Sequence, residues 1–424
     1  MIIYTVEGSD TLSDICRRFA VEETEVARIN DLDDPDSLAQ GQALVLPTED
    51  FSYVVKRGDT VFSLARRFGR TVEEIYDDNP PLRDRPLIEG ETVVVSGPFP
   101  KYGPLAVNGY AYAFMDTALL EEVLPYLTYL TIFSYGARED GSLINVDDEK
   151  LIEIALRYGV APLMLLTTIS EEGTFNSEIV REILENAPVG EALIEEVTAK
   201  LLEKGYRGVD VDFEYIPQDL SEEYARFLEK MREALADKGL LLFVSLAPKT
   251  YAEQPGILYE AHDYGALGAA ADRALIMTYE WGYTYGPPMA IAPIREVRRV
   301  AQYAVTEIPP EKLMLGMPNY AYDWTLPFVK GESAAVTLGN PQAAALAAQT
   351  GAEIFFDESA ASPWFEYSDG AVSHEVWFED PRSVTAKLEL IRELKLSGTG
   401  VWNLMRRFTA LWYLIGYYYD ILKI

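Results

Sequence analysis

The chain has 424 residues, of which 49% are hydrophobic and 25% are charged, as expected for a globular protein of two or three domains. Its formal net charge of -32 argues against nucleic acid or an anionic membrane as a partner, because both require clustered lysine and arginine side chains. The single cysteine, Cys16, excludes an internal disulfide framework and two histidines offer little for a metal site, so we expect no metal and no cofactor.

The first residues, Met1 to Glu7, include no basic segment and no apolar run long enough for export or for a membrane span. As written, the sequence predicts a protein without a signal peptide that is made and left in a cytoplasm. A membrane is therefore not expected as a partner.

The first hundred residues contain one unit that recurs after 49 positions. The recurring segments are Tyr4-Thr5-Val6 with Tyr53-Val54-Val55, Asp10-Thr11-Leu12 with Asp59-Thr60-Val61, and Arg17-Arg18-Phe19 with Arg66-Arg67-Phe68. The register continues without a gap through Asn30/Asn79, Gly41/Gly90 and Val45/Val94. Each copy predicts a strand, a helix that begins at the Asp-Thr cap, a second helix, a turn at the glycine and a closing strand. We expect two such βααβ modules, over residues 1–48 and 51–96.

This unit resembles the LysM module, which binds N-acetylglucosamine chains of peptidoglycan or chitin in a shallow groove. The groove lies between the first strand-helix loop and the second helix-strand loop. The resemblance implies glycan contacts at Asp10, Thr11 and Leu12 in the first copy and at Asp59, Thr60 and Val61 in the second. A duplicated structural unit without a ligand is the alternative. Residues 1–50 hold 3 basic and 12 acidic residues and residues 51–100 hold 7 and 8, so we expect the second copy to bind an acidic glycan better.

A Pro/Gly-rich stretch over residues 97–104 breaks both periodicities and predicts a short linker. Beyond it, in residues 105–424, apolar strand-like runs alternate with helix-like segments, and the eight runs are Ala106–Tyr112, Tyr129–Tyr135, Pro162–Thr168, Gly208–Glu214, Leu241–Ala247, Ala274–Glu280, Lys312–Tyr320 and Gly398–Trp402. Eight such alternations predict an α/β fold of the (β/α)8 TIM-barrel type. An open doubly wound sheet is the alternative, but no Gly-rich phosphate loop follows the first run.

The fourth run carries three carboxylates on one face, because Asp210, Asp212 and Glu214 are spaced by two residues. Like charges at this spacing raise one another's proton affinity, so at least one of the three is expected to hold a proton near neutral pH. An amphipathic edge strand with its acids in water is the alternative. The opposite face carries Val209, Val211 and Phe213, which favours a strand buried on both sides and therefore a catalytic role for the acids.

This segment resembles the D-G-x-D-x-D-x-E signature of glycoside hydrolase family 18, whose members are TIM barrels that cleave β-linked N-acetylglucosamine polymers. Gly208 and the three acids match the signature, whereas Arg207 replaces its first Asp and Phe213 replaces the usual Trp. In the sixth strand, Met277-x-Tyr279 matches the M-x-Y-D segment of the family, with Glu280 in place of Asp. Trp402 matches the tryptophan of the family that forms the floor of the subsite in which the reacting sugar binds.

Active residues of barrel enzymes lie where strands end, so polar and aromatic residues at these positions are candidate substrate contacts. We expect this of Met277, Glu280 and Trp402, of Tyr110 in the first strand, and of Tyr320, Asp323 and Trp324 in a seventh strand that is expected to run from Gly316 to Trp324. Residues 325–381 are too long for a simple loop and resemble the small α+β insertion of part of the family. Trp364 and Trp377 in this insertion could contact sugar or pack inside it.

The resemblance implies a substrate-assisted retaining mechanism, in which the 2-acetamido oxygen of the substrate attacks the anomeric carbon. Glu214 would be the acid and then the base, Asp212 would orient the acetamido group, Asp210 would tune Asp212, and Tyr279 would bind the acetamido carbonyl. Nearly the whole chain also resembles spore-cortex-lytic N-acetylglucosaminidases, which implies peptidoglycan as the partner and a place at the spore. A chitinase or chitooligosaccharidase, and a glycan-binding protein on an inactive barrel, are the alternatives.

Overall fold

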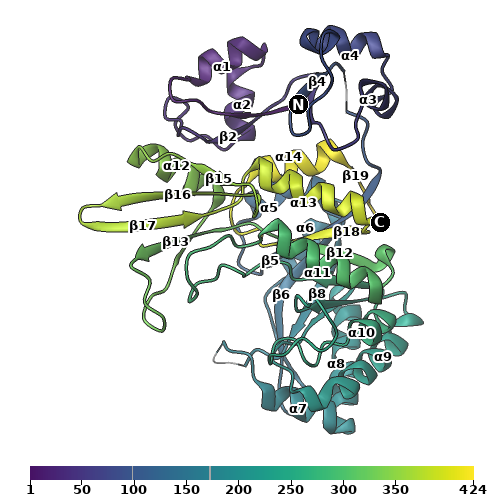
Figure 1. The fold of residues 1–424 in the computed structure, drawn as a ribbon. Helices are drawn as coiled ribbons and strands as arrows, with labels where there is room; N and C mark the ends of the chain where they lie inside the picture. The colour runs from purple at the N-terminus through teal and green to yellow at the C-terminus, as the bar shows by residue number, and fades with distance from the viewer. Residues whose placement is uncertain (98, 171–172) are drawn as a thin grey trace.

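The computed structural model describes residues 1–97, 99–170 and 173–424, and its centre is a closed barrel of eight parallel strands (Figure 1). In chain order these strands are β5 (Pro104–Tyr112), β6 (Tyr129–Ala137), β8 (Ala161–Thr167), β9 (Gly208–Asp212), β10 (Leu241–Leu246), β11 (Arg273–Ile276), β12 (Leu313–Pro318) and β18 (Gly398–Trp402). Each strand pairs with the next, and β18 pairs with β5, which closes the barrel. The predicted TIM barrel is therefore confirmed.

Helices surround the barrel and cover the outward face of its strands. They are α5 (Thr117–Val123), α6 (Glu149–Arg157), α7 (Ser177–Glu185), α8 (Ala187–Lys204), α9 (Ser221–Ala236), α10 (Tyr264–Ala270), α11 (Ile294–Glu307), α13 (Pro381–Leu394) and α14 (Thr409–Tyr418). Two short strands, β7 (Leu143–Ile144) and β19 (Asp420–Ile421), extend the sheet at β6 and β5. Both faces of the barrel strands are buried, which explains their nearly continuous apolar sequences.

Local signals set the ends of several elements around the acid-bearing strand. Helix α8 ends at Gly205, which adopts the left-handed conformation with φ 78° that glycine tolerates best. Three residues later the chain enters β9. Helix α13 begins with a capping box. The Asp380 carboxylate accepts a hydrogen bond from the backbone N–H of Ser383, and the Ser383 hydroxyl accepts one from the backbone N–H of Asp380.

The insertion forms a five-stranded antiparallel sheet beside the mouth of the barrel, with one helix packed on it. Its elements are β13 (Ala321–Leu326), β14 (Val336–Leu338), α12 (Asn340–Thr350), β15 (Phe355–Asp357), β16 (Ser362–Asp369) and β17 (Val372–Trp377). The prediction of one seventh strand from Gly316 to Trp324 is wrong. The chain leaves the barrel after Pro318, where β12 ends beside Trp402 of β18, and the next strand, β13, pairs with β14 and β17 in the insertion sheet.

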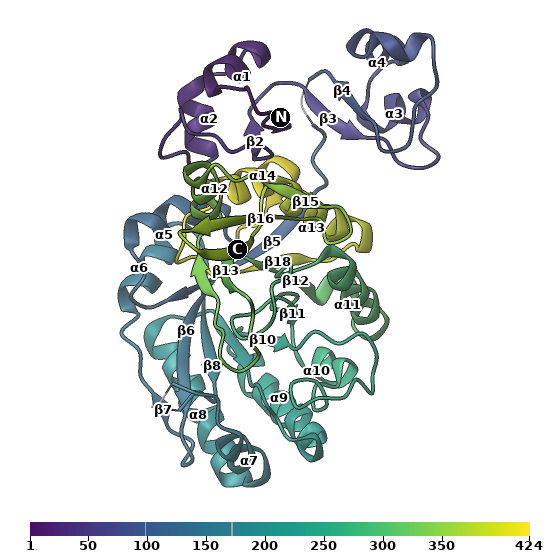
Figure 2. The same cartoon turned by 60° about the vertical axis from the view of Figure 1, so that its left-hand side comes forward.

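The two N-terminal modules have the predicted βααβ order, with β1 (Ile2–Thr5), α1 (Leu12–Phe19), α2 (Glu23–Ile29) and β2 (Ala43–Leu46) in the first and β3 (Phe51–Val54), α3 (Val61–Phe68), α4 (Val72–Asp78) and β4 (Thr92–Val95) in the second. An asparagine at the equivalent position of each copy connects a helix to the closing strand by hydrogen bonds. Asn30 bonds the backbone of Val26 and Val45, and Asn79 bonds the equivalent residues 49 positions later. The first module lies against the barrel and the second stands apart from it (Figure 2).

The predicted linker is short, because β4 ends at Val95 and β5 already begins at Pro104. Pro98, which belongs to this predicted linker, lies outside the described residues. Within residues 1–97, 99–170 and 173–424, no helix is both long enough and apolar enough to cross a bilayer.

Candidate active site

The three carboxylates of the acid-bearing segment lie at the carboxyl end of β9, in the mouth of the barrel. Asp210 is fully buried and Asp212 is 8% exposed, while Val209 and Val211 on the opposite face are buried against the helices. The strand ends at Asp212, so Glu214 lies on the loop that follows it rather than in the strand. The sequence alternation nevertheless placed all three acids on the side of the barrel mouth.

Asp210 is held by two hydroxyl groups from other strands. The Tyr110 hydroxyl donates to its Oδ2 at 2.7 Å, and the Ser245 hydroxyl donates to its Oδ1 at 3.2 Å. Burial raises the pKa of Asp210 to about 6, and these two hydrogen bonds oppose that rise. Gly400 makes the Tyr110 contact possible, because a Cβ there would lie 3.2 Å from the tyrosine ring and 2.5 Å from Leu275. Tyr110, predicted to contact substrate, is thus a support for Asp210 inside the barrel.

Asp212 and Glu214 both hold protons more tightly than ordinary carboxylic acids. Burial raises the pKa of Asp212 well above its usual value, with further contributions from the charges of Glu214 and Asp210. Burial, followed by the charge of Glu280, raises the pKa of Glu214 to about 7. The expectation of a proton held near neutral pH agrees with these shifts. One oxygen of Asp212, Oδ1, is buried without a hydrogen-bond partner, so it can accept a bond from a bound molecule.

Tyr279 follows the sixth strand and faces the acids. Its pKa is raised well above the ordinary value by burial and then by the charges of Asp212 and Glu214, which places its hydroxyl in the same electrostatic field. Gly316 provides the room for this ring, because a Cβ there would lie 2.8 Å from its Cε1 atom. Met277 is half-buried and packs on the cluster inside the barrel.

Glu280 is a separate carboxylate beside the acids. Its backbone has the unusual φ of 68° for a residue with a side chain, and its carboxylate accepts hydrogen bonds from the hydroxyls of Tyr320 and Tyr322. Burial raises the pKa of Glu280, and these two tyrosines oppose the rise. The structure therefore brings Tyr320 and Glu280 together as predicted candidates. Tyr322 was not singled out from the sequence, although it follows Tyr320 in the same alternating pattern.

Trp402 lies at the end of β18 in a cluster of aromatic rings. Its ring centroid is 5.3 Å from that of Phe133, 5.9 Å from that of Tyr110 and 6.1 Å from that of Tyr112. Phe114, whose side chain is 78% exposed, continues the cluster at 5.2 Å from Tyr112. Sequence reasoning missed Tyr112, Phe114 and Phe133. The alternation of Tyr110, Tyr112 and Phe114 at the end of the first strand is a signal that could have identified two of them.

Asp323 and Trp324 are enclosed by the insertion and do not line the mouth as predicted. Asp323 accepts from the hydroxyl of Tyr367 at 2.7 Å and is paired with the ring of His374 at 2.9 Å. Trp324 is fully buried and donates its ring N–H to the carbonyl of Gly286 at 2.8 Å. Both predictions depended on the continuous seventh strand, which the structure does not contain.

The two insertion tryptophans stack on each other. Their centroids are 5.7 Å apart with planes 17° from parallel, and Trp377 is mostly buried and donates to Glu375 at 2.7 Å. Trp364 is half-buried, and its other neighbour in the sheet is Phe355. Packing of the insertion, which is one of the two roles considered from the sequence, is therefore their observed arrangement.

The residues predicted to bind glycan in the first module have structural roles within it. Asp10 accepts from the Tyr4 hydroxyl and the backbone of Glu7, and Thr11 caps α1. Leu12 is 2% exposed in the core of the module, so the prediction that it contacts glycan is wrong. In the second module, Asp59 and Thr60 brace the same turn and cap, while Val61 is half-buried.

In the part of the chain that the structure describes, no group of three or more histidine, cysteine, aspartate or glutamate side chains is placed to hold a metal ion. The mouth instead offers a proton donor near pH 7, an acceptor oxygen without a partner, a buried tyrosine hydroxyl and an aromatic floor. Such a set can protonate a leaving oxygen and hold a sugar ring.

The fold and this site define a glycoside hydrolase. The model of glycosyl hydrolases family 18 matches residues 173–406, which is more than half of the chain, and the LysM domain model matches residues 4–47 and 53–96. The chain therefore belongs to glycosyl hydrolase family 18, is an enzyme of the glycosylase class, and carries two LysM domains.

Relatives that match nearly the whole chain include enzymes named for the bacterial spore cortex. The chain is 38% identical to the cortical fragment-lytic enzyme of Bacillus subtilis over 430 residues, which cover 100% of this chain and 99% of that protein. The crystal structure of the spore cortex-lytic enzyme SleL of Bacillus megaterium matches with a TM-score of 0.88 at 36% identity, covering 100% of this chain and 99% of that one. The SleL structure of Bacillus cereus matches with a TM-score of 0.89 at 32% identity, covering 99% and 98%. The chain is thus a homologue of cortical fragment-lytic enzymes.

Proposed function

We propose that this enzyme hydrolyses the β-1,4 bond after N-acetylglucosamine in spore-cortex peptidoglycan, with retention of configuration at the anomeric carbon. The observation that carries the proposal is the arrangement of Asp212, the buried last residue of β9, and Glu214, a half-buried acid two positions further on, whose pKa is raised to about 7. Glu214 can therefore be protonated at neutral pH and still ionise during the reaction.

The placement of the acids favours participation of the substrate rather than a protein nucleophile. A retaining enzyme with its own nucleophile needs a carboxylate across the sugar from the acid, at about 5 Å. Asp212 is the last residue of β9, only two positions before Glu214 in the chain, and the carboxylate of Glu280 is engaged by Tyr320 and Tyr322. The acetamido oxygen of the substrate is then the nucleophile, as in the substrate-assisted exception to that rule.

Glu214 gives its proton to the leaving oxygen while the acetamido oxygen attacks the anomeric carbon and forms an oxazolinium ion. The unpartnered Oδ1 of Asp212 accepts the acetamido N–H, and when the proton that Asp212 shares with Asp210 lies on Asp210, the negative charge of Asp212 stabilises the ion. Tyr279 donates to the acetamido carbonyl oxygen. Ionised Glu214 then removes a proton from the water that opens the intermediate, which restores the enzyme.

Asp210 acts on the reaction through Asp212. Its pKa of about 6 lies close enough to neutrality for it to share a proton with its neighbour, and the hydroxyls of Tyr110 and Ser245 fix its position. The aromatic side chains of Trp402 and Phe133 supply a face on which the sugar ring stacks. Both features serve a neutral N-acetyl sugar at the cleavage point.

Spore-cortex peptidoglycan is the proposed polymer because the similarity to cortical fragment-lytic enzymes extends over both LysM domains and the barrel. The LysM region then holds the enzyme on the glycan and keeps it at the spore. Likeness to a chitinase of Chromobacterium violaceum, at 24% identity and a TM-score of 0.69, extends over 74% of this chain and shows the fold alone.

The test is mass spectrometry of the products formed from spore-cortex peptidoglycan by the wild type and by Glu214→Gln. We expect fragments that end in reducing N-acetylglucosamine from the wild type and none from the variant. Glu366→Gln, a change of an exposed carboxylate in the insertion, serves as the matched control and should cut as the wild type does. Release of products from chitin but not from cortex would replace the proposed polymer, and absence of cutting from both would refute hydrolysis.

A further inference from the structure

The two LysM modules can be compared residue by residue, because 49 positions separate equivalent residues. In each copy the same two backbone hydrogen bonds bring the first loop next to the second. Val6 bonds Gln42 and Gly41 in the first module, and Val55 bonds Glu91 and Gly90 in the second, all at 2.8 Å. We call these loops the groove loops; they are residues 6–10 and 31–41 in the first module and residues 55–59 and 80–90 in the second.

The second groove loop of the first module is fixed to the insertion. Ala39 is 3% exposed and belongs to the buried cluster of the insertion. The Gln40 carbonyl accepts from the backbone of Ile354 at 2.8 Å, and the Gln40 side chain donates to Glu353 at 2.8 Å. A Cβ on Gly41 would lie 1.9 Å from the Ile354 carbonyl oxygen, so the two backbones are in close contact. This loop is therefore covered on one side by the catalytic domain.

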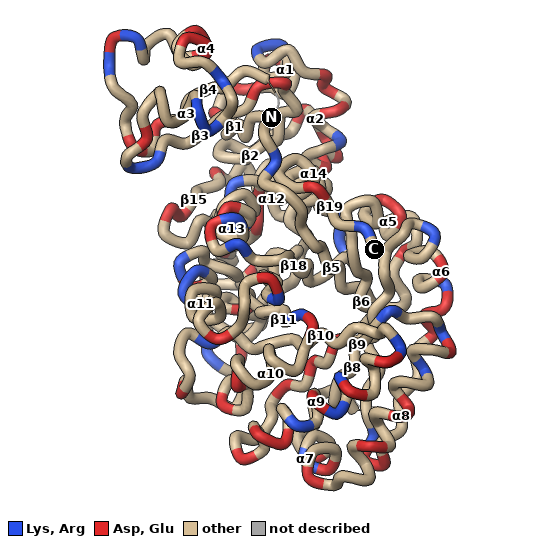
Figure 3. Tube along the Cα trace, turned by 90° about the vertical axis from the view of Figure 1, so that its right-hand side faces the viewer, with Lys and Arg blue, Asp and Glu red and all other residues tan. Residues whose placement is uncertain are grey.

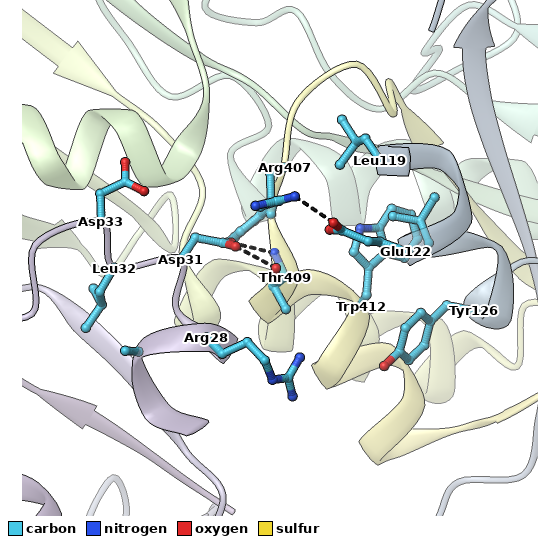
Figure 4. A pocket seen from close by; sticks show the side chains of 13 residues that line it. Arg28, Asp31, Leu32, Asp33, Leu119, Glu122, Tyr126, Arg407, Thr409 and Trp412 are labelled. Carbon is cyan, nitrogen blue, oxygen red and sulfur yellow. Dashed lines mark hydrogen bonds and ion pairs between the residues drawn. The ribbon is translucent and has the colours of Figure 1, made fainter. Parts of the chain in front are cut away.

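The first module is also attached to the barrel itself. Met1, Ile29 and Val45 belong to the same buried cluster as the barrel helices. The Asp31 carboxylate accepts from both the backbone N–H and the hydroxyl of Thr409, each at 2.6 Å. Beside this contact lies a cavity of about 500 Å³ between the module and the barrel, which is bordered by the ion pair of Arg407 and Glu122 (Figure 4). Two separate contacts thus fix the orientation of the first module.

The second module has its own buried core and leaves its groove loops in solvent. Ile88, equivalent to the buried Ala39, is 58% exposed, and Phe62, equivalent to Ser13, is 68% exposed. Its contacts with the catalytic domain include the ion pair of Lys56 with Glu389 and the packing of Tyr417 on its core. Exposed apolar side chains beside both loops offer contacts to the apolar faces of sugar rings.

The charge of the groove loops differs in the same direction. Those of the first module carry six carboxylates and no basic residue, namely Glu7, Asp10, Asp31, Asp33, Asp34 and Asp36. Those of the second carry four basic residues, Lys56, Arg57, Arg83 and Arg85, against three acidic ones, Asp59, Asp84 and Glu89. Blue segments are accordingly frequent in the second module of Figure 3. Lys56 is paired with Glu389, Arg83 with Glu73 and Asp77, and Arg85 with Glu91. The exposed Arg57 is then the cation that the second set of loops offers to a glycan carboxylate, whereas the first set would repel that carboxylate.

From these differences we infer that the second module is the glycan-capturing module, and that it takes N-acetylglucosamine strands whose muramic residues still carry carboxylates. The first module is a fixed spacer that sets the distance from the captured strand to the barrel. The identity of the glycan rests on the proposed function, whereas capture itself does not require hydrolysis.

The test measures binding of the full chain to purified peptidoglycan with intact stem peptides, by cosedimentation at low salt. All chains carry Glu214→Gln so that the glycan stays intact. The test variant adds Arg57→Gly, Phe62→Ser and Ile88→Ala, which are the residues that the first module has at the equivalent positions. We expect roughly tenfold weaker binding, because exposed aromatic and arginine side chains dominate recognition. Ser13→Ala, at the position equivalent to Phe62, is the matched control and should bind within about twofold of the parent.

Amidation of the glycan carboxylates provides a second readout. It should weaken binding of the parent chain several-fold and have less effect on a chain with Arg57→Glu, a single exposed change that leaves the module core intact. Equal binding by the parent and the triple variant, or an equal loss in Ser13→Ala, would overturn the inference. In chains with Glu214 restored, hydrolysis of a soluble N-acetylglucosamine oligosaccharide should be unchanged. Failure of that hydrolysis in the wild type would count against the proposed function alone.

Discussion

Two regions of the barrel bury carboxylates, and they compensate the buried charge in different ways. Directly after the insertion in the chain, the carboxylate of Glu379 is 2.7 Å from the ammonium of Lys387, and both side chains are 1% exposed. The Ser383 hydroxyl donates to the same carboxylate. In the barrel mouth, Asp212 instead faces the carboxylates of Glu214 and Asp210. The first arrangement neutralises a charge with a cation, whereas the second neutralises charge by holding protons.

This difference separates a structural group from a reactive one. Burial raises the pKa of Glu379, and the charge of Lys387 together with the hydrogen bonds from Lys387 and Ser383 opposes that rise, so a cation and a hydroxyl hold this carboxylate. The acids of the mouth have raised pKa values because burial and mutual repulsion favour their neutral forms, so a small change in their surroundings moves a proton. Buried acids without a cation are therefore the feature on which the proposed catalytic role of this end of the barrel rests.

The largest expected effect comes from Glu214→Gln, which keeps the shape of the side chain and removes its transferable proton. Hydrolysis of an N-acetylglucosamine oligosaccharide should fall by about 10²- to 10⁴-fold, measured as kcat. The thermal stability should be unchanged or slightly higher, because the variant no longer buries an ionisable group. Retention of wild-type kcat would remove Glu214 from the role of the acid.

At the structural pair, Lys387→Met should lower the free energy of unfolding by about 3–5 kcal/mol, because it leaves the Glu379 carboxylate buried without a cation. The double variant Lys387→Met with Glu379→Gln should recover much of this loss. Denaturant unfolding measures both. If the single variant were as stable as the wild type, the pair would not be compensating a buried charge, and the contrast with the mouth would fail.

In the mouth, the free energy of unfolding should depend on pH because an acid there holds its proton more tightly in the folded protein than in the unfolded chain. The pKa of Glu214 is raised from 4.5 to about 7, so between these pH values the folded protein holds a proton that the unfolded chain has released. The free energy of unfolding therefore falls as pH rises from about 4.5 to 7, by up to about 3 kcal/mol from this group. A variant with both Asp212→Asn and Glu214→Gln should show a flatter profile in denaturant titrations. An equally steep profile in that variant would assign the effect to other groups.

The smallest expected effect concerns Glu280, whose charge adds to burial in raising the pKa of Glu214. Glu280→Gln should move the loss of kcat/KM at high pH to a lower pH by about half a unit to one unit, because the proton donor ionises earlier. Tyr320→Phe, which removes a hydrogen bond to Glu280 but no charge, is the comparison variant. A profile that does not move in Glu280→Gln would show that burial alone sets this pKa.

Much of the architecture was predictable because it depends on periodicity. The eight barrel strands were located from apolar runs, and the fourth and sixth end earlier than predicted, at Asp212 and Ile276. The seventh strand could not be placed correctly, since the alternation of Tyr320, Tyr322 and Trp324 continues past the true end at Pro318. The residues after Pro318 pair instead with β14 and β17 of the insertion, and β17 lies about fifty residues further along the chain, so this pairing is not visible in the local pattern.

The sequence by itself determined the repeat, the barrel and the identity of the acids, because each follows from spacing along a single segment. The tertiary structure alone decided how these parts are used. It placed the hydroxyls of Tyr110 and Ser245 on Asp210 and those of Tyr320 and Tyr322 on Glu280, and it attached only the loop at Ala39 to the insertion. These features join strands and modules that are far apart in the chain, so burial and electrostatics act there only after the fold has formed.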